Sequence, residues 1–248
     1  MIRGVLFFIE DILPYIAIAV FLFGTVFRLW MWLKVPVPLR INMAPAKTTW
    51  RAVTGKIAAE VLVFVSLLRN DKALWAAAWI MHVCGLVVIL GSHIFGLVDS
   101  SIELWTPLRL QSGKTIIFIA AVFSFPLIAA LLFLLLKRVF SINVKRISIF
   151  SDYFALILIL AHVSNGIYMS FFTDLDMAEV TKWGMGLATL KPYVVEGSWI
   201  FALHCFTACA LFIYFPFSKL FHPLGQIVSR WTLTQKEKPL VPGGAVVE

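Results

Sequence analysis

Residues 197–222 read GSWIFALHCFTACALFIYFPFSKLFH, an apolar segment that carries histidines at positions 204 and 222. At about 100° per residue, the 18 steps from His204 to His222 return the second imidazole to the azimuth of the first, roughly 27 Å along a continuous helix. An earlier apolar segment, WAAAWIMHVCGLVVILGSHIFGLV, carries His82 and His93. Their separation of 11 residues places both within about 20° of one face, some 16 Å apart in height. The spacing predicts two helices, each with two stacked histidines.

Paired histidines on two helices suit a particular cofactor. Neutral imidazole is a common axial ligand of haem iron, and a bis-histidine haem takes one ligand from each of two facing helices. Two such pairs would hold two haems, one above the other. The alternative is that these histidines are hydrogen-bonded inside a helical bundle, and spacing alone leaves both interpretations open.

The two ligand spacings do not match for parallel helices. The difference between the two rises, about 10 Å, has to be absorbed by relative tilt of the helices and by a kink at Pro216.

Composition defines the class of protein. Of 248 residues, 61% are hydrophobic and 14% charged, and the mean hydropathy is +0.93, so polar residues are too few to cover a soluble globule. A membrane-spanning helix needs about 20 mostly apolar residues. We therefore expect an all-α membrane protein, a five-transmembrane-helix bundle over residues 1–230 followed by a short polar cytoplasmic tail, 231–248. The expected spans are 12–34, 75–97, 115–136, 152–173 and 197–217.

The formal net charge of +8 follows topology, which argues against a nucleic-acid partner. Lysine and arginine number seven in 34–74, four in 137–150 and four in the C-terminal tail from residue 219. The alternate segments together hold five, against eight acidic residues. The positive-inside rule then predicts an extracytoplasmic N-terminus and a cytoplasmic C-terminus in the cell membrane.

Three cysteines, Cys84, Cys205 and Cys209, lie within the expected spans and form no CxxC or CxxCH motif. This pattern argues against iron–sulfur ligation and covalent haem attachment within this chain. We interpret the cysteines as packing residues.

Three features leave alternatives open. Arg28, inside the first span, either extends to the interface or pairs with a buried anion such as a haem propionate. Residues 49–69 predict an amphipathic cationic helix, for which the lipid headgroups or a cytoplasmic partner are equally suitable. His162 lies near mid-bilayer, and because no second histidine shares its helix, packing or hydrogen bonding is favoured over ligation.

Several segments carry a family resemblance: DILPYIAIAVFLFGTVFR in the first span, HVCGLVVILGSHIFG in the second and LHCFTACALFIYFPFSKLFH at the end of the fifth. Over nearly its whole length the chain resembles the cytochrome b membrane subunits related to the gamma chain of respiratory nitrate reductase. PVPLRI and EVLVFVSLLRN, near the start and end of the first cytoplasmic loop, are most similar to the M subunits of the sulfite-reduction-associated (Dsr) membrane complexes.

The resemblance implies two b haems, an outer one held by His93 and His204 and an inner one held by His82 and His222. It implies an electron-transfer subunit of a larger oxidoreductase, exchanging electrons between a (mena)quinol pool and a cytoplasmic iron–sulfur subunit similar to heterodisulfide reductase, in sulfite or sulfate reduction. Other membrane and extracytoplasmic subunits would complete the complex. The alternatives within the family are the gamma subunit of a nitrate reductase and a heterodisulfide reductase membrane subunit.

A quinol site is expected in the outer loop 98–114. Lys114 begins a span about 20 residues after His93, as the quinol-contacting lysine does in nitrate-reductase relatives, and would hold the ring oxygen while a base takes the proton. Asp99 or Glu103 would pass that proton outward, and Arg109 could instead neutralise a haem propionate. The alternative is that Lys114 only anchors the third span at the headgroups.

Two other functional classes compete with electron transfer. A transporter with a histidine proton relay is one, although the chain lacks an inverted repeat or a pair of broken helices. A haem-free membrane anchor is the other. A reduced-minus-oxidised visible spectrum separates all three.

Overall fold

A computed structural model of the chain describes residues 2–34, 50–89, 113–195 and 198–226. Every regular element within these ranges is helical, and the described residues contain no strand. The elements are α1 (Ile2–Phe7), η1 (Phe8–Ile12), α2 (Leu13–Lys34), α3 (Trp50–Leu62), α4 (Val65–Asn70), α5 (Lys72–Val88), α6 (Gly113–Phe140), α7 (Ile142–Lys145), α8 (Phe150–Phe172), α9 (Met177–Ala188), α10 (Trp199–Tyr214), η4 (Phe215–Phe217) and η5 (Lys219–Phe221).

Four helical stretches are long and apolar enough to cross a membrane, so the chain is a multi-pass membrane protein. They are Arg3–Lys34, Phe118–Phe140, Phe150–Phe172 and Trp199–Phe217. The expected span 75–97 begins within α5, a shorter apolar helix of 17 residues. The remainder of that span lies outside the described residues, so the number five stays a prediction.

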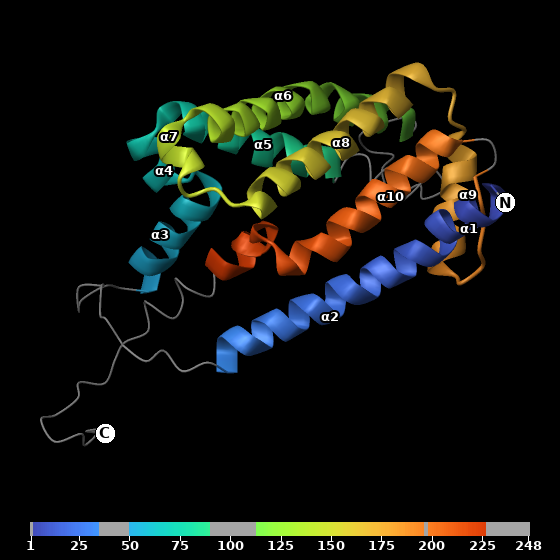
Figure 1. The fold of residues 1–248 in the computed structure, drawn as a ribbon, viewed down its shortest axis with the longest axis horizontal. Coiled ribbons are helices and arrows are strands. Elements are labelled where there is room, and N and C mark those ends of the chain that lie inside the picture. Colours follow the sequence, from blue (N-terminus) through green and yellow to red (C-terminus); the bar gives the residue numbers. More distant parts are fainter. Residues whose placement is uncertain (1, 35–49, 90–112, 196–197, 227–248) are drawn as a thin grey trace, which may run out of the picture.

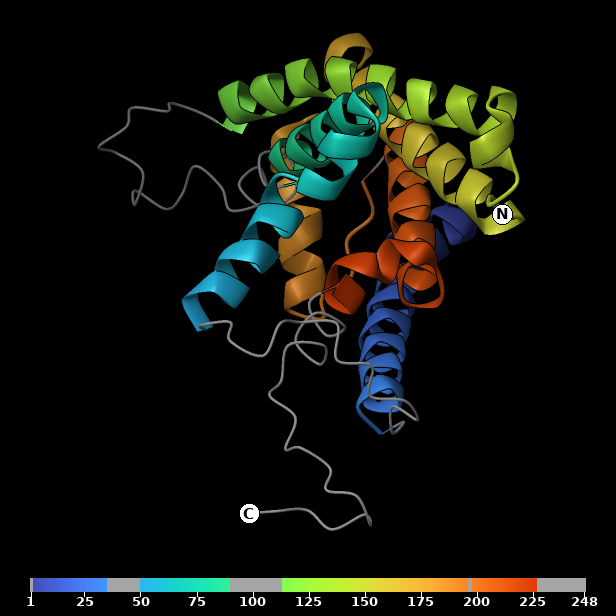
Figure 2. The same ribbon diagram turned by 90° about the vertical axis from the view of Figure 1, so that its left-hand side faces the viewer.

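The apolar helices pack in the order α5, α6, α8, α10, α2. Taken in chain order, these five helices alternate in direction (Figures 1 and 2). One end of the bundle, on the left of Figure 1, gathers the ends of α2 and α6, the start of α5 and the 3-10 turns after α10. Basic residues at this end are Lys34, Lys72, Lys137, Arg138 and Lys219. These residues belong to the segments whose charge predicted a cytoplasmic location, and the orientation of the bundle stays a prediction.

The cysteines lie in the packed interior, as the sequence predicted. Cys84 packs with Leu127 and Leu131, and Cys205 packs with Phe201 and Val195. All three cysteines, Cys84, Cys205 and Cys209, are buried free thiols.

The predicted helix over 49–69 forms as two helices, α3 and α4, which is a difference from the sequence interpretation. The break lies at Phe64, whose φ of 53° is in the left-handed region. Tertiary contacts override local propensity here, because the indoles of Trp75 and Trp79 donate to the carbonyls of Val63 and Leu62 (2.7 and 3.3 Å). These bonds satisfy carbonyls that the end of α3 leaves unpaired.

The continuous helix expected from His204 to His222 is also interrupted. α10 ends at Tyr214 and is followed by two 3-10 turns, η4 and η5, with extended backbone at Ser218 between them. Pro216 lies in η4, so the predicted kink is present. The straight rise of roughly 27 Å therefore does not apply. The chain leaves the α-helical path before it reaches His222, and because His93 lies outside the described residues, the comparison of the two ligand spacings stays a prediction.

The break is held by α2. The Arg28 guanidinium donates from Nη1 to the carbonyls of Pro216 (2.5 Å) and Ser218 (3.0 Å). Gly24 allows this approach, since a Cβ there would lie 2.8 Å from the Pro216 ring. Arg28 thus binds the carbonyls of the broken helix end, a role that the sequence interpretation did not include.

An acidic pair fixes the opposite end of the bundle. Glu10 and Asp11, in the π-helical turn η1, are 0% and 1% exposed. The Val195 N–H donates to Glu10 Oε2 (2.8 Å) and the Tyr193 N–H donates to Asp11 Oδ1 (3.0 Å). The indole of Trp183 donates to the Glu10 carbonyl (2.9 Å). The first helix is therefore tied to α9 and to the segment that leads into α10.

Replacing Asp11 tests this attachment. In Asp11→Leu the part-buried N–H of Tyr193 loses its acceptor, and we expect the apparent Tm in detergent to fall by on the order of 5 °C, from a loss of about 1–3 kcal/mol. Asp11→Asn keeps an acceptor oxygen and should retain the parental Tm. A leucine variant as stable as the parent, measured by differential scanning fluorimetry, would contradict the assignment.

Candidate haem site

His82 and His222, 140 residues apart in sequence, face each other at one end of the bundle. Their ring centroids are 5.8 Å apart and the rings are perpendicular. Two imidazoles that share one metal atom, with metal–nitrogen bonds of about 2 Å, have centroids on the order of 6 Å apart. The structure thus brings together the two residues predicted as the inner pair, and their role as ligands of one iron atom stays a prediction.

Hydrogen bonds fix the tautomer of both rings. His82 Nδ1 donates to the Ala78 carbonyl (2.7 Å), and His222 Nδ1 donates to the Lys219 carbonyl (2.9 Å). A carbonyl only accepts, so each Nδ1 carries the hydrogen and each Nε2 carries the lone pair. Metal-binding histidines typically show this arrangement, because the bond from the other nitrogen orients the ring.

The surroundings favour the neutral imidazole. Desolvation by neighbouring groups, together with the proximity of His82, lowers the pKa of His222 below its ordinary value. Phe64, at the break between α3 and α4, packs its ring edge-on against His82 with the centroids 4.9 Å apart. The helix break therefore places the Phe64 ring against the His82 ring.

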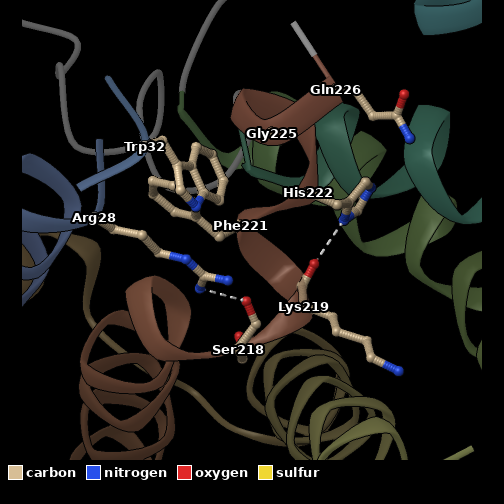
Figure 3. Close-up of a pocket in the computed structure, with 8 residues that line it drawn as sticks. All are labelled: Arg28, Trp32, Ser218, Lys219, Phe221, His222, Gly225 and Gln226. Carbon is tan, nitrogen blue, oxygen red and sulfur yellow. Dashed lines mark hydrogen bonds between the residues drawn. The ribbon is translucent and has the colours of Figure 1, made fainter. Parts of the chain in front are cut away.

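A pocket of about 320 Å³ opens beside His222 (Figure 3). Figure 3 shows the Arg28 guanidinium on one side of it and the His222 imidazole on the other. The guanidinium lies against the rings of Trp32 and Phe221, at 5.3 and 4.9 Å from their centroids. No carboxylate among the described residues pairs with Arg28. Its positive charge fits an anionic substituent such as a haem propionate.

A buried carboxylate, which the sequence interpretation missed, holds the turn that carries His222. The Asp152 side chain, 3% exposed, pairs with Lys219 (2.8 Å) of η5 and with Arg138 (3.6 Å) of α6. Lys137, next to Arg138, pairs with Asp71 at the start of α5 and lowers the pKa of that carboxyl. These pairs connect α5, α6, α8 and η5 around the inner site.

His204, on α10, has a different neighbourhood. Its Nδ1 donates to Asn165 Oδ1 (3.2 Å), and its ring stacks on that of His162 with centroids 4.1 Å apart and an interplanar angle of 25°. A stack this close leaves no room for a metal between the two rings, so His162 is not the ligand opposite His204. His93, the predicted partner of His204, lies outside the described residues, and the outer pair stays a prediction.

The predicted quinol residues fall mostly outside the described part of the chain. Asp99, Glu103 and Arg109 lie outside it, and for Lys114 only the backbone is described, in the first turn of α6. The start of the third span is therefore where the sequence placed it, while the contacts of these four side chains stay predictions.

Asn165 and Gly166 contact the ring of His204, a role that was not predicted for them. A Cβ at Gly166 would lie 3.3 Å from His204 Cε1. The two positions follow His162 by three and four residues on one face of α8, and that spacing was the available signal.

These features define a class: a multi-pass membrane protein with two histidine rings in contact at one end of its helical bundle. Residues 41–235 match the family model described as nitrate reductase gamma subunit. The chain belongs to this family.

Curated relatives agree with the family assignment. The chain is 31% identical to the Hdr-like menaquinol oxidoreductase cytochrome b-like subunit of Archaeoglobus fulgidus, over 91% of this chain and 78% of the relative. It is 24% identical to the subunit of the same name from Archaeoglobus profundus, over 86% and 74%. It is 27% identical to the respiratory nitrate reductase 1 gamma chain of Escherichia coli, over 87% and 88%.

Neutralising Asp152 should loosen the turn that carries His222. Because Lys219 is 60% exposed, solvent weakens its ion pair with Asp152, which we expect to contribute about 1 kcal/mol. Losing that contribution changes the equilibrium for local opening of η5 roughly fivefold. Asp152→Asn should therefore accelerate trypsin cleavage after Lys219 about fivefold in detergent, as measured by mass spectrometry of the fragments.

The matched control is Glu179→Gln, which removes the exposed pair with Lys182 at the other end of the bundle. It should leave cleavage after Lys219 unchanged. Equal cleavage rates in Asp152→Asn and the parent would show that the ion pair does not hold η5.

Proposed function

We propose that this chain is a dihaem cytochrome b subunit of a membrane respiratory complex, exchanging electrons between a menaquinol pool and a cytoplasmic iron–sulfur subunit. The observation that carries the proposal is the His82–His222 pair, 5.8 Å apart, with both Nδ1 atoms bonded to backbone carbonyls. When bound between two neutral imidazoles, haem b supplies a one-electron carrier. Arg28 provides a positive charge for a propionate.

The second haem is assigned to His204 with His93. Two observations support His204 as its ligand. Its Nδ1 donates to Asn165, which leaves the lone pair on Nε2. His204 also lies within α10, whereas His222 follows the 3-10 turns at the basic end of the bundle. With one pair on each side of the bilayer, the overall reaction moves electrons across the membrane field, a step worth about 2.3 kcal/mol per charge per 100 mV.

The substrate and partner follow from the relatives. The two archaeal relatives are named Hdr-like menaquinol oxidoreductase subunits, which supports menaquinol as substrate and a heterodisulfide-reductase-like iron–sulfur protein as partner. The resemblance of the first cytoplasmic loop to M subunits supports a role of the complex in sulfite or sulfate reduction. The likeness to the nitrate reductase gamma chain keeps a nitrate-reducing complex as the alternative.

The basic end of the bundle is the docking surface for that partner. Lys56 and Arg69 lie on α3 and α4, and Lys72 begins α5. Since the chain has no iron–sulfur motif of its own, electrons that reach the inner site need an acceptor on this face.

Haem stoichiometry tests the proposal. We expect pyridine haemochrome analysis of the intact complex to give two b haems per chain, one in His222→Ala and one in His204→Ala, because each variant removes an axial ligand of a different haem. The remaining haem in each variant serves as the internal control. One haem or none in the parent would refute the dihaem assignment.

Quinol binding tests the outer site. We propose that Lys114 holds the quinol oxygen, that Asp99 or Glu103 passes the proton outward, and that Arg109 neutralises a propionate. Lys114→Ala should slow haem reduction by a menaquinol analogue about 10²-fold or more, the scale of a lost proton-transfer or positioning group, without loss of haem.

Lys182→Ala is the matched control, since it removes an exposed lysine of α9 that pairs only with Glu179 among described carboxylates. In this variant the menaquinol analogue should reduce the haems at the parental rate. A Lys114→Ala variant with full haem content and the parental rate would move the quinol site elsewhere, first to the region around His162.

A further inference from the structure

We propose that His162 is a positioning residue for the outer haem, which fixes the ring plane of His204 and so sets the reduction potential of that haem. The inference rests on the proposed function, in which His204 is an axial ligand. Ligand orientation and contacts around the ligand are among the levers by which a protein tunes haem iron.

Three neighbouring positions of α8 hold the His204 ring. His162 covers one face at 4.1 Å and 25°, Asn165 accepts the Nδ1 hydrogen at 3.2 Å, and Gly166 meets the Cε1 edge. These positions are i, i+3 and i+4, so one face of a single helix presents all three. A face, an edge and a hydrogen bond together restrict rotation of the imidazole about both of its side-chain torsions.

His162 is itself held. Its Nδ1 lies 2.9 Å from Thr207 Oγ1, and the buried Thr207 hydroxyl lies 3.1 and 3.0 Å from the carbonyls of Leu203 and His204. The hydroxyl hydrogen is used by these carbonyls, so Oγ1 accepts from His162 Nδ1. Contacts therefore run from His204 to His162, on to Thr207, and back to the α10 backbone at His204.

Simple packing does not account for this residue. His162 lies halfway along α8, at a depth where a leucine would fill the space without burying polar nitrogens. Metal ligation opposite His204 is excluded by the 4.1 Å stack. The His162 ring face contacts the His204 ring directly, and its hydrogen bond reaches Thr207, whose hydroxyl contacts the His204 carbonyl.

The test compares three substitutions in the complex with both haems bound. His162→Leu removes the ring and the hydrogen bond, His162→Phe keeps a ring face, and Thr207→Val removes only the hydroxyl that orients His162. Redox potentiometry and electron paramagnetic resonance follow the two b haems separately, and the inner haem is the internal control.

We expect His162→Leu to shift the potential and the largest g-value of the outer haem while leaving both inner values unchanged. His162→Phe should restore most of the parental g-value, and Thr207→Val should shift it in the same direction as the leucine variant, by less. We also expect the outer haem in His162→Leu to transfer to apomyoglobin about 10-fold faster, the lower end of effects seen when contacts to a ligand are removed.

Unchanged outer signals in both His162→Leu and Thr207→Val would overturn the inference, as would a shift confined to the inner haem. If His162→Leu loses all haem, Thr207→Val decides, and parental signals there count against the inference. A parent protein without two b-haem signals would instead defeat the proposed function, so the two failures are distinguishable.

Discussion

The site depends on one type of hydrogen bond, in which the Nδ1 of a histidine donates to an oxygen atom. In the described part of the chain, four histidines show it: His82 with the Ala78 carbonyl, His222 with the Lys219 carbonyl, His204 with Asn165 and His162 with Thr207. A neutral imidazole whose Nδ1 donates in this way carries its lone pair on Nε2, the form that binds iron. The other features of the fold place these rings in pairs.

The two helix breaks, at Phe64 and after α10, both bring side chains to the His82–His222 pair. The left-handed residue Phe64 ends α3 and packs on His82, and the 3-10 turns after α10 bring His222 toward α5. Side chains bind backbone carbonyls at each break: tryptophan indoles at the first, and Arg28 at the second. The cost of two helix breaks is thus offset locally, close to the ligands.

Local periodicity and family resemblance predicted the helical class and four of the spans. The two histidines of the predicted inner pair lie in contact, and their pairing on one haem stays a prediction. Periodicity failed where a non-local contact decides the backbone. The 18-residue spacing assumed one continuous helix, yet Pro216 and Arg28 end it early. The Asp152–Lys219 pair and the His162–His204 stack join residues 67 and 42 positions apart, which no window of sequence reports. The five-span count, His93 and the quinol residues remain predictions.

The most direct measurement is a cryo-EM map of the haem-loaded complex at a resolution that shows imidazole rings. The account predicts iron density between the Nε2 atoms of His82 and His222, with both Nδ1 atoms still on the carbonyls of Ala78 and Lys219. A map without a haem between these rings, or with iron held by other side chains, would contradict it.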